Sequence, residues 1–147
     1  MWEGEARAAV EAAERAAQLL APGPAIVRRG PRGVEVEVPV MYEGVAVDSI
    51  RLDPATCRAM PKGMPHPPGG PSGAACGERE AREEAARVIE GLRVLGAAEY
   101  RGPEGAWMVP LAWGHMIVVH LRLRVRRGTV EVLHDPRLTA EVLRRLG

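Results

Sequence analysis

The strictest pattern in the sequence is the alternation of valine with other side chains between residues 34 and 40. Such alternation predicts a β-strand with one face in a core and the other in solvent. A second apolar run, Val45 to Leu52, follows the turn at Tyr42-Glu43-Gly44, so the two runs are predicted to form a hairpin. Because the inward side chains of both strands must share one face, this hairpin constrains the fold more than any other segment.

The phase of the second run predicts an irregularity in this hairpin. A two-residue turn at Glu43-Gly44 brings the start of the second run into phase with the first, but Ile50 and Leu52 then fall out of phase. One extra residue at Asp48-Ser49, opposite Pro39, restores the inward set, and we predict a β-bulge there. The predicted register pairs Val40 with Val47, Val38 with Ile50, and Val36 with Leu52.

The rest of the chain supplies three amphipathic helices and three further strands. Apolar residues recur at helical spacing in residues 3–20 and 78–95, and Asp135 followed by Pro136 begins a short C-terminal helix. The strands are predicted at 106–112, 116–126 and 129–134. The sequence therefore predicts an α+β fold in the order α-β-β-α-β-β-β-α, with a five-stranded, mostly antiparallel sheet and helices packed on one face.

The length of 147 residues suits one domain. Residues 53–77 carry no periodicity and are rich in proline and glycine. Long loops without structure of their own are uncommon inside compact domains, and many of them are functional. We predict a single domain, residues 1–147, in which 53–77 is a loop insertion. No internal repeat is visible in the sequence.

Charge and composition argue against two classes of partner. The net charge of +1 is too small for the chain as a whole to attract nucleic acid or membranes electrostatically. The first residues are acidic where a secretory signal is basic, and no uncharged stretch reaches the length of a membrane span. We expect a cytoplasmic protein. The absence of Phe and the use of Arg in place of Lys fit a GC-rich genome and are compatible with a thermophile.

A row of arginines is the candidate nucleic-acid site. Arg122, Arg124 and Arg126 alternate along one predicted strand, and Arg127 follows at its turn. Guanidinium groups on one strand face can contact phosphates, so RNA binding through these four residues is the alternative hypothesis. The predicted register, however, sets Glu131 opposite Arg124, and cross-strand pairs of this kind neutralise the row. The strand also lacks the interleaved aromatic residues that stack on bases.

Cysteines and histidines give no recognisable metal or catalytic pattern. Cys57, His66 and Cys76 lie in or beside the loop, without the short Cys-x-x-Cys clasp or the fourth ligand of a structural zinc site. A Cys57–Cys76 disulfide is geometrically possible, but it would not persist in a reducing cytoplasm, so we expect two free cysteines. An enzyme using His120 or Cys76 would need a pocket that holds a second titratable group. We therefore predict no metal, no cofactor and no catalytic residue.

Two segments are candidates for protein binding. The sequence Pro65-His66-Pro67-Pro68 can form a polyproline helix of the kind that aromatic grooves bind, and methionine nearby suits an adaptable contact. Residues 107–113 are more apolar than a solvated hairpin around a turn requires, and tryptophan is enriched at interfaces. Core packing is the alternative for these tryptophans. The candidate binding residues are Met64, Pro65, Pro67, Pro68, Trp107 and Trp113.

These observations favour a non-enzymatic protein- or peptide-interaction domain that acts as a homodimer. The order of elements resembles that of small dimeric binding modules such as secretion-chaperone-like folds. The resemblance is one of fold, which does not fix function. The sequence leaves open the partner, the oligomeric state, and whether residues 53–77 are ordered.

Overall fold

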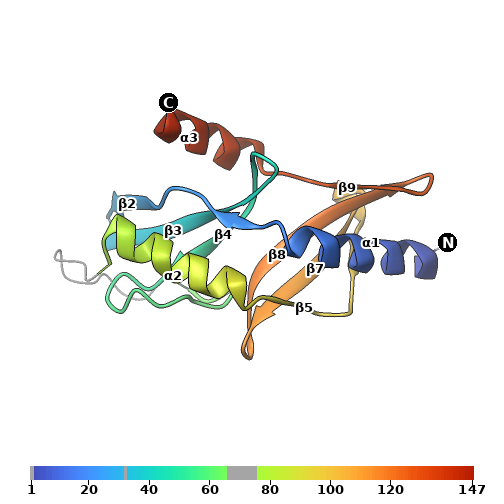
Figure 1. Ribbon diagram of the computed structural model, residues 1–147, viewed down its shortest axis with the longest axis horizontal. Coiled ribbons are helices and arrows are strands. Elements are labelled where there is room, and N and C mark those ends of the chain that lie inside the picture. The colour runs from blue at the N-terminus through green and yellow to red at the C-terminus, as the bar shows by residue number, and fades with distance from the viewer. Residues whose placement is uncertain (1, 32, 66–75) are drawn as a thin grey trace.

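The computed structural model describes residues 2–31, 33–65 and 76–147. Within these residues, three helices and two antiparallel sheets confirm the predicted α+β class (Figure 1). The helices are α1 (Trp2–Ala17), α2 (Glu78–Glu90) and α3 (Pro136–Leu146). The first sheet contains β1 (Ala21–Pro22), β2 (Ile26–Gly30), β3 (Gly33–Tyr42) and β4 (Val45–Leu52). The second contains β5 (Arg93–Val94), β6 (Glu99–Arg101), β7 (Ala106–Trp113), β8 (Met116–Arg126) and β9 (Thr129–Val132).

The first hairpin contains the predicted turn and a bulge close to the predicted place. Glu43 and Gly44 both have positive φ, 50° and 85°, as a two-residue hairpin turn requires. The extra residue is Val47 rather than one of Asp48-Ser49, because Ala46 pairs with Met41 and Asp48 pairs with Val40. Beyond the bulge the register is as predicted, with Val38 opposite Ile50 and Val36 opposite Leu52.

The strands divide between two sheets of four and five strands, where the sequence predicted one sheet of five. The additional strands are β1, β2, β5 and β6, which are two to five residues long. Helix α2 ends at Glu90 instead of continuing to Leu95, because Gly91 forms the C-cap and the backbone then enters β5. The predicted end of this helix at residue 95 is therefore wrong.

Two prolines lie in the middle of the central strands at equivalent places. Pro39 in β3 accepts a hydrogen bond from the Gly23 N–H (2.8 Å), in the gap between β1 and β2. Pro110 in β7 accepts one from the Leu95 N–H (3.0 Å), in the gap between β5 and β6. Proline has no N–H to donate, so a carbonyl on the flanking strand would have no partner at these positions. The flanking strand is interrupted there in both sheets.

The two sheets repeat one another in register, although no internal repeat was visible in the sequence. In the first sheet Tyr42 pairs with Val45, Met41 with Ala46, and Pro39 with Ser49, with a bulge at Val47. In the second, Trp113 pairs with Met116, Ala112 with Ile117, and Pro110 with His120, with a bulge at Val118. The sequences match weakly at these positions: Val-Pro-Val-Met-Tyr at 38–42 corresponds to Val-Pro-Leu-Ala-Trp at 109–113. The described chain therefore contains two copies of a helix–sheet unit.

The two units exchange equivalent backbone hydrogen bonds where β4 and β8 meet. The segment after β4 donates the Lys62 N–H to the Ile117 carbonyl, and the segment after β9 donates the Asp135 N–H to the Ala46 carbonyl, both at 2.8 Å. Ile117 and Ala46 are themselves equivalent in register. A reciprocal exchange of this kind is the mark of a two-fold interface. We call this contact the sheet junction.

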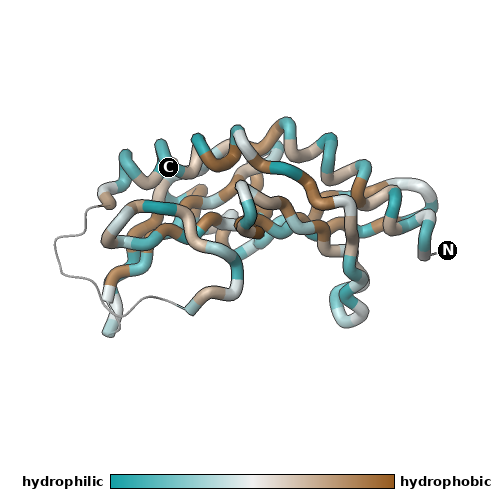
Figure 2. Tube along the Cα trace, turned by 90° about the horizontal axis from the view of Figure 1, so that it is seen from below, coloured by the Kyte–Doolittle hydropathy of each residue, from teal (hydrophilic) through white to brown (hydrophobic). Residues whose placement is uncertain are grey.

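Helices α1 and α2 follow one another along the same side of the strands (Figures 1 and 2). Most of their buried residues are small, Ala9, Ala13 and Ala16 in α1 and Ala81, Ala85 and Val88 in α2, so α1 lies close to the second sheet and α2 close to the first. Helix α3 packs on the opposite face of the first sheet, where Leu138 contacts Ile26 and Ala46. Asp135 caps α3 by accepting a hydrogen bond from the Leu138 N–H (3.0 Å), as predicted.

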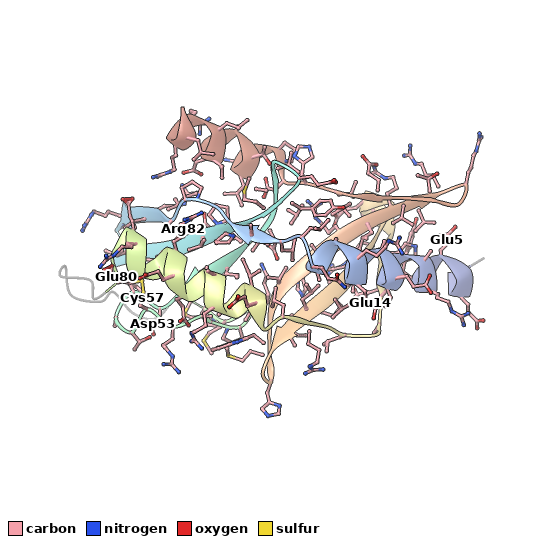
Figure 3. The ribbon with its side chains drawn as sticks, in the orientation of Figure 1. Glu5, Glu14, Asp53, Cys57, Glu80 and Arg82 are labelled. Carbon is pink, nitrogen blue, oxygen red and sulfur yellow. A yellow bond between two sulfur atoms is a disulfide. The ribbon has the colours of Figure 1, made fainter. Side chains whose placement is uncertain are left out.

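A disulfide joins Cys57 to Cys76, so the expectation of two free cysteines is wrong. Cys76 lies just before α2, and Figure 3 shows Cys57 beside the first turn of that helix. Arg82 fastens the same helix to the first sheet, since its guanidinium donates to the carbonyls of Gly23 and Pro22, both at 3.2 Å. The disulfide closes a loop whose ends are 19 residues apart, and residues 66–75 of that loop lie outside the described residues.

We expect reduction of the disulfide to destabilise the protein by about 2–4 kcal/mol, because the cross-link restricts the unfolded chain. Chemical denaturation with and without a phosphine reductant measures this difference. The double variant Cys57→Ser/Cys76→Ser should match the reduced wild type and should not respond to the reductant. A wild type whose denaturation midpoint is unchanged on reduction would contradict a stabilising disulfide.

Candidate functional site

The predicted tryptophan segment forms one continuous strand, β7, and its turn lies beyond it at Gly114-His115. Trp107 is buried with 6% exposure beneath α1, and its Nε1 donates to Glu5 Oε1 at 3.3 Å. Trp113 is half-buried, and the Arg87 guanidinium lies 4.8 Å from the centre of its ring. Trp107 therefore belongs to the core, whereas Trp113 borders the surface beside a cation.

The predicted proline-rich site is described only in part. Met64 is 46% exposed and Pro65 is exposed. The backbone before Pro65 is held in place because the Arg51 guanidinium donates to the Met64 carbonyl. Pro67 and Pro68 lie outside the described residues. Of this candidate site, the structure therefore describes only Met64 and Pro65.

The arginine row is partly neutralised by carboxylates. Arg122 forms an ion pair with Glu104 at 3.0 Å, and Arg124 forms one with Glu131 at 3.7 Å, in the predicted register. Both guanidinium groups also donate to backbone carbonyls, those of His134 and Glu104. The other two members of the row, Arg126 and Arg127, lie exposed at the turn between β8 and β9. The row is therefore not a uniform basic surface.

A groove of about 500 Å³ lies at the sheet junction. Its walls come from both units: the bulged part of β4, the outer face of β7 and β8, and the first turn of α3. Sequence reasoning could not place it, because these three walls lie far apart in the chain. The residues that line it include Asp48, Met108, His120, Arg122, Asp135 and Arg137.

Asp48 connects the two units within this groove. Its Oδ1 accepts a hydrogen bond from Lys62 Nζ and its Oδ2 accepts one from the His120 N–H, both at 2.7 Å. The side chain is only 18% exposed, so these charge-assisted bonds are partly shielded from water. Since both carboxylate oxygens are engaged, Asp48 holds the two sheets together and is poorly placed to act as a general base.

His120 is the titratable side chain in the groove with a shifted pKa. Its partial burial lowers the pKa of the imidazole, and the charge of Lys62 lowers it further, against an opposing effect of Asp48. The ring is therefore mostly neutral at pH 7 and could accept a proton. On the sequence alone, an enzyme would need a pocket that holds His120 or Cys76 beside a second titratable group, and this groove holds His120 beside Asp48. Among the described residues of the groove, however, no side chain is placed as a nucleophile next to His120.

A second groove of about 490 Å³ lies between α3 and the first sheet. At its centre, Arg28 donates to Glu37 Oε1 at 3.0 Å and to Glu141 Oε1 at 2.6 Å. These hydrogen bonds raise the pKa of Arg28, and the bond to Arg28 lowers the pKa of Glu141. Ser49 also donates to Glu37, at 3.1 Å. The polar groups of this groove therefore bind one another and fix α3 to the sheet.

Within the described residues, no cluster of three or more His, Cys, Asp or Glu side chains could hold a metal ion. None of the described helices combines the length and apolar character needed to cross a membrane. Comparison with known proteins finds no family model, curated protein or solved structure that matches this chain. The candidate sites therefore rest on the geometry of the chain alone.

We expect loss of the Asp48 carboxylate to weaken the sheet junction. Asp48→Ala leaves the His120 N–H and the Lys62 ammonium without their acceptor and should lower the free energy of unfolding by about 1–3 kcal/mol. Urea denaturation measures this change. The control is Glu131→Ala, which removes a carboxylate that is 67% exposed and should cost at most about 1 kcal/mol. Equal losses of unfolding free energy in the two variants would show that Asp48 stabilises the sheet junction no more than an exposed carboxylate does.

The shifted pKa of His120 also predicts a pH dependence. The unfolded imidazole titrates near pH 6.5, whereas the folded one resists protonation to lower pH. The unfolded state therefore binds more protons below about pH 6.5, and stability should fall as the pH drops through this range and into the folded pKa. Denaturation from pH 8 to 5 measures the decline, and His120→Gln should reduce it. An unchanged decline in that variant would assign the effect to other groups.

Proposed function

We propose that this chain is a non-enzymatic protein- or peptide-interaction domain that acts as a homodimer. The observation that carries the proposal is the exposed apolar flank of α3. Leu143 and Leu146 lie one turn apart, with 58% and 68% of their surface in solvent. Isolated exposed leucines are common, but two neighbours on one helix flank are typical of a binding surface.

The hydrogen bonds that the carboxylates of both grooves already make support a binding role rather than a catalytic one. Asp48, Glu37 and Glu141 each hydrogen-bond a cation within their groove. A general base must be able to take a proton from a substrate, and these carboxylates are already engaged. Both grooves therefore serve more readily as rigid walls for a partner than as centres of proton transfer.

Helix α3 also suits contact with a second copy of the chain. In a two-fold dimer each residue contacts its counterpart or a reciprocal partner, so one apolar flank is sufficient on each copy. The flank lies on the side of α3 opposite to Arg137 and Arg144, which border the second groove. Pairing through Leu143 and Leu146 therefore leaves that groove and its ion pairs unchanged.

RNA binding stays an untested alternative, and the paired state of Arg122 and Arg124 weighs against it. The cytoplasmic location is also part of this proposal. Structural disulfides are rare in a reducing cytoplasm, except in hyperthermophiles. A cytoplasmic location for a protein with the Cys57–Cys76 disulfide therefore fits best with a thermophilic source, with which the composition is compatible.

We expect Leu143→Asp/Leu146→Asp to abolish dimerisation. Burying a leucine contributes about 1.5–3 kcal/mol, so losing two on each copy should raise the dimer dissociation constant by at least about 100-fold. Sedimentation equilibrium over a range of concentrations measures this constant. The matched control is Leu19→Asp, a leucine that is 60% exposed near the end of α1. A wild-type chain that stays monomeric throughout would refute the homodimer.

A further inference from the structure

The two grooves adjoin one another at the first turn of α3, where Asp135 and Arg137 line both of them. From this point the groove at the sheet junction runs over apolar side chains, which include Val47 and Met108. The second groove runs along α3, and most of its lining residues are charged. Together the grooves form one surface with an apolar end and a charged end. We call it the α3 surface.

The carboxylates of the α3 surface already have partners. Glu37 and Glu141 accept hydrogen bonds from Arg28, at 3.0 and 2.6 Å. Asp48 accepts one from the ammonium of a lysine at 2.7 Å, and Asp135 accepts one from a backbone N–H at 3.0 Å. A cationic ligand would have to displace these bonds, so the carboxylates are poor groups for binding one.

Arg137 and Arg144 are the cations of this surface that are left for a ligand. Both residues are exposed, and within the described residues neither guanidinium forms an ion pair or a hydrogen bond. The other two arginines of the surface are engaged, since Arg28 pairs with two carboxylates and Arg122 with Glu104. A free guanidinium beside a preformed groove suits an anion, and it binds a carboxylate through two parallel hydrogen bonds.

The spacing of these two arginines indicates the form of an acidic partner. They lie seven residues apart on α3, which is close to two full turns, so both face the second groove, about 10.5 Å apart along the helix axis. A peptide in the polyproline II conformation has three residues per turn and a rise of about 3.1 Å per residue. Its residues i and i+3 therefore share one face and lie about 9.3 Å apart, which matches the two guanidinium groups.

We propose that the α3 surface binds an extended acidic segment of a partner protein, with acidic residues three positions apart on Arg137 and Arg144. A further three positions along, on the side of Arg137, an apolar residue of the same segment enters the groove at the sheet junction, whose volume of about 500 Å³ accommodates a large side chain. The inference rests on the proposed interaction function and specifies the chemistry of the partner. A nucleic-acid phosphate chain could meet the same guanidinium groups, but it has no apolar side chain for the other end.

The test uses the full chain and a dye-labelled peptide, Leu-Pro-Ser-Glu-Pro-Ser-Glu, together with the peptide of reversed order, because side-chain contacts alone do not fix the direction of the backbone. Binding is measured by fluorescence anisotropy. We expect one of the two peptides to bind saturably, and replacing both of its glutamates by glutamine should weaken binding at least about tenfold. Moving the two glutamates next to each other, without changing the composition, should weaken it as well.

Substitutions in the chain locate the binding surface. Arg137→Glu and Arg144→Glu should each weaken binding at least about tenfold, and Met108→Ala should weaken it at least about threefold. Since both arginines are exposed, the two charge-reversal variants should unfold at the same denaturant concentration as the wild type. The control Arg126→Glu changes an exposed arginine at the far end of β8 and should bind as the wild type does.

A charge exchange assigns one acidic residue of the peptide to one arginine. A peptide in which the glutamate farther from the leucine is replaced by lysine should bind the wild type weakly. It should recover affinity on the Arg144→Glu chain but not on the Arg137→Glu chain, because only the first of these pairs places opposite charges together.

Equal binding of the glutamine peptide, unchanged affinity in both charge-reversal variants, or no saturable binding of either peptide up to about 1 mM would overturn the inference. A labelled uridine oligonucleotide that binds more tightly than the peptides, and is lost in the same variants, would also overturn it and would assign the arginines to RNA. The homodimer assay is independent of these outcomes, so a failure here leaves the proposed function to be judged by sedimentation.

Discussion

The exchange of backbone hydrogen bonds at the sheet junction is the interaction on which the rest of the structure depends. The Lys62 and Asp135 N–H groups each cross to the other unit, and Asp48 adds a side-chain link to the His120 N–H. These bonds join two small sheets, each too narrow to bury a large core, along one line beneath α1 and α2. A single buried cluster then contains residues of both units. The junction also brings the outer faces and the start of α3 together, which creates the groove.

Sequence reasoning identified the long strands well because burial fixes their phase. The positions from Val36 to Leu52 can point inward together in one register, and a bulge was required to achieve it. The pairing of Arg124 with Glu131 followed from the same argument. The short strands β1, β2, β5 and β6 were missed, since a strand of two to five residues beside glycine and proline shows no periodicity.

The candidate site was largely invisible in the sequence because it consists of contacts between distant segments. Arg28 and Glu141 are separated by 113 positions, and Asp48 and His120 by 72. No local pattern encodes such distances. Asp48 offered one signal, a carboxylate in an otherwise apolar run at a predicted bulge, and bulges often redirect a side chain. The disulfide was missed for another reason: the geometry permitted it, and the assumed compartment argued against it.

The repeat was missed because the two copies preserve geometry more than residue type. Pro39 and Pro110, the bulges and the junction carbonyls keep their places, while the side chains on the outer faces differ. Those differences separate the roles of the two faces. Asp135 caps a helix that covers the first sheet, whereas the equivalent residue Lys62 has no carboxylate to cap one and is followed by Gly63 with positive φ. The same backbone frame therefore supports different side-chain chemistry on its two outer faces: Ile26 lies under α3 on the first sheet, whereas the equivalent position on the second sheet is Glu99.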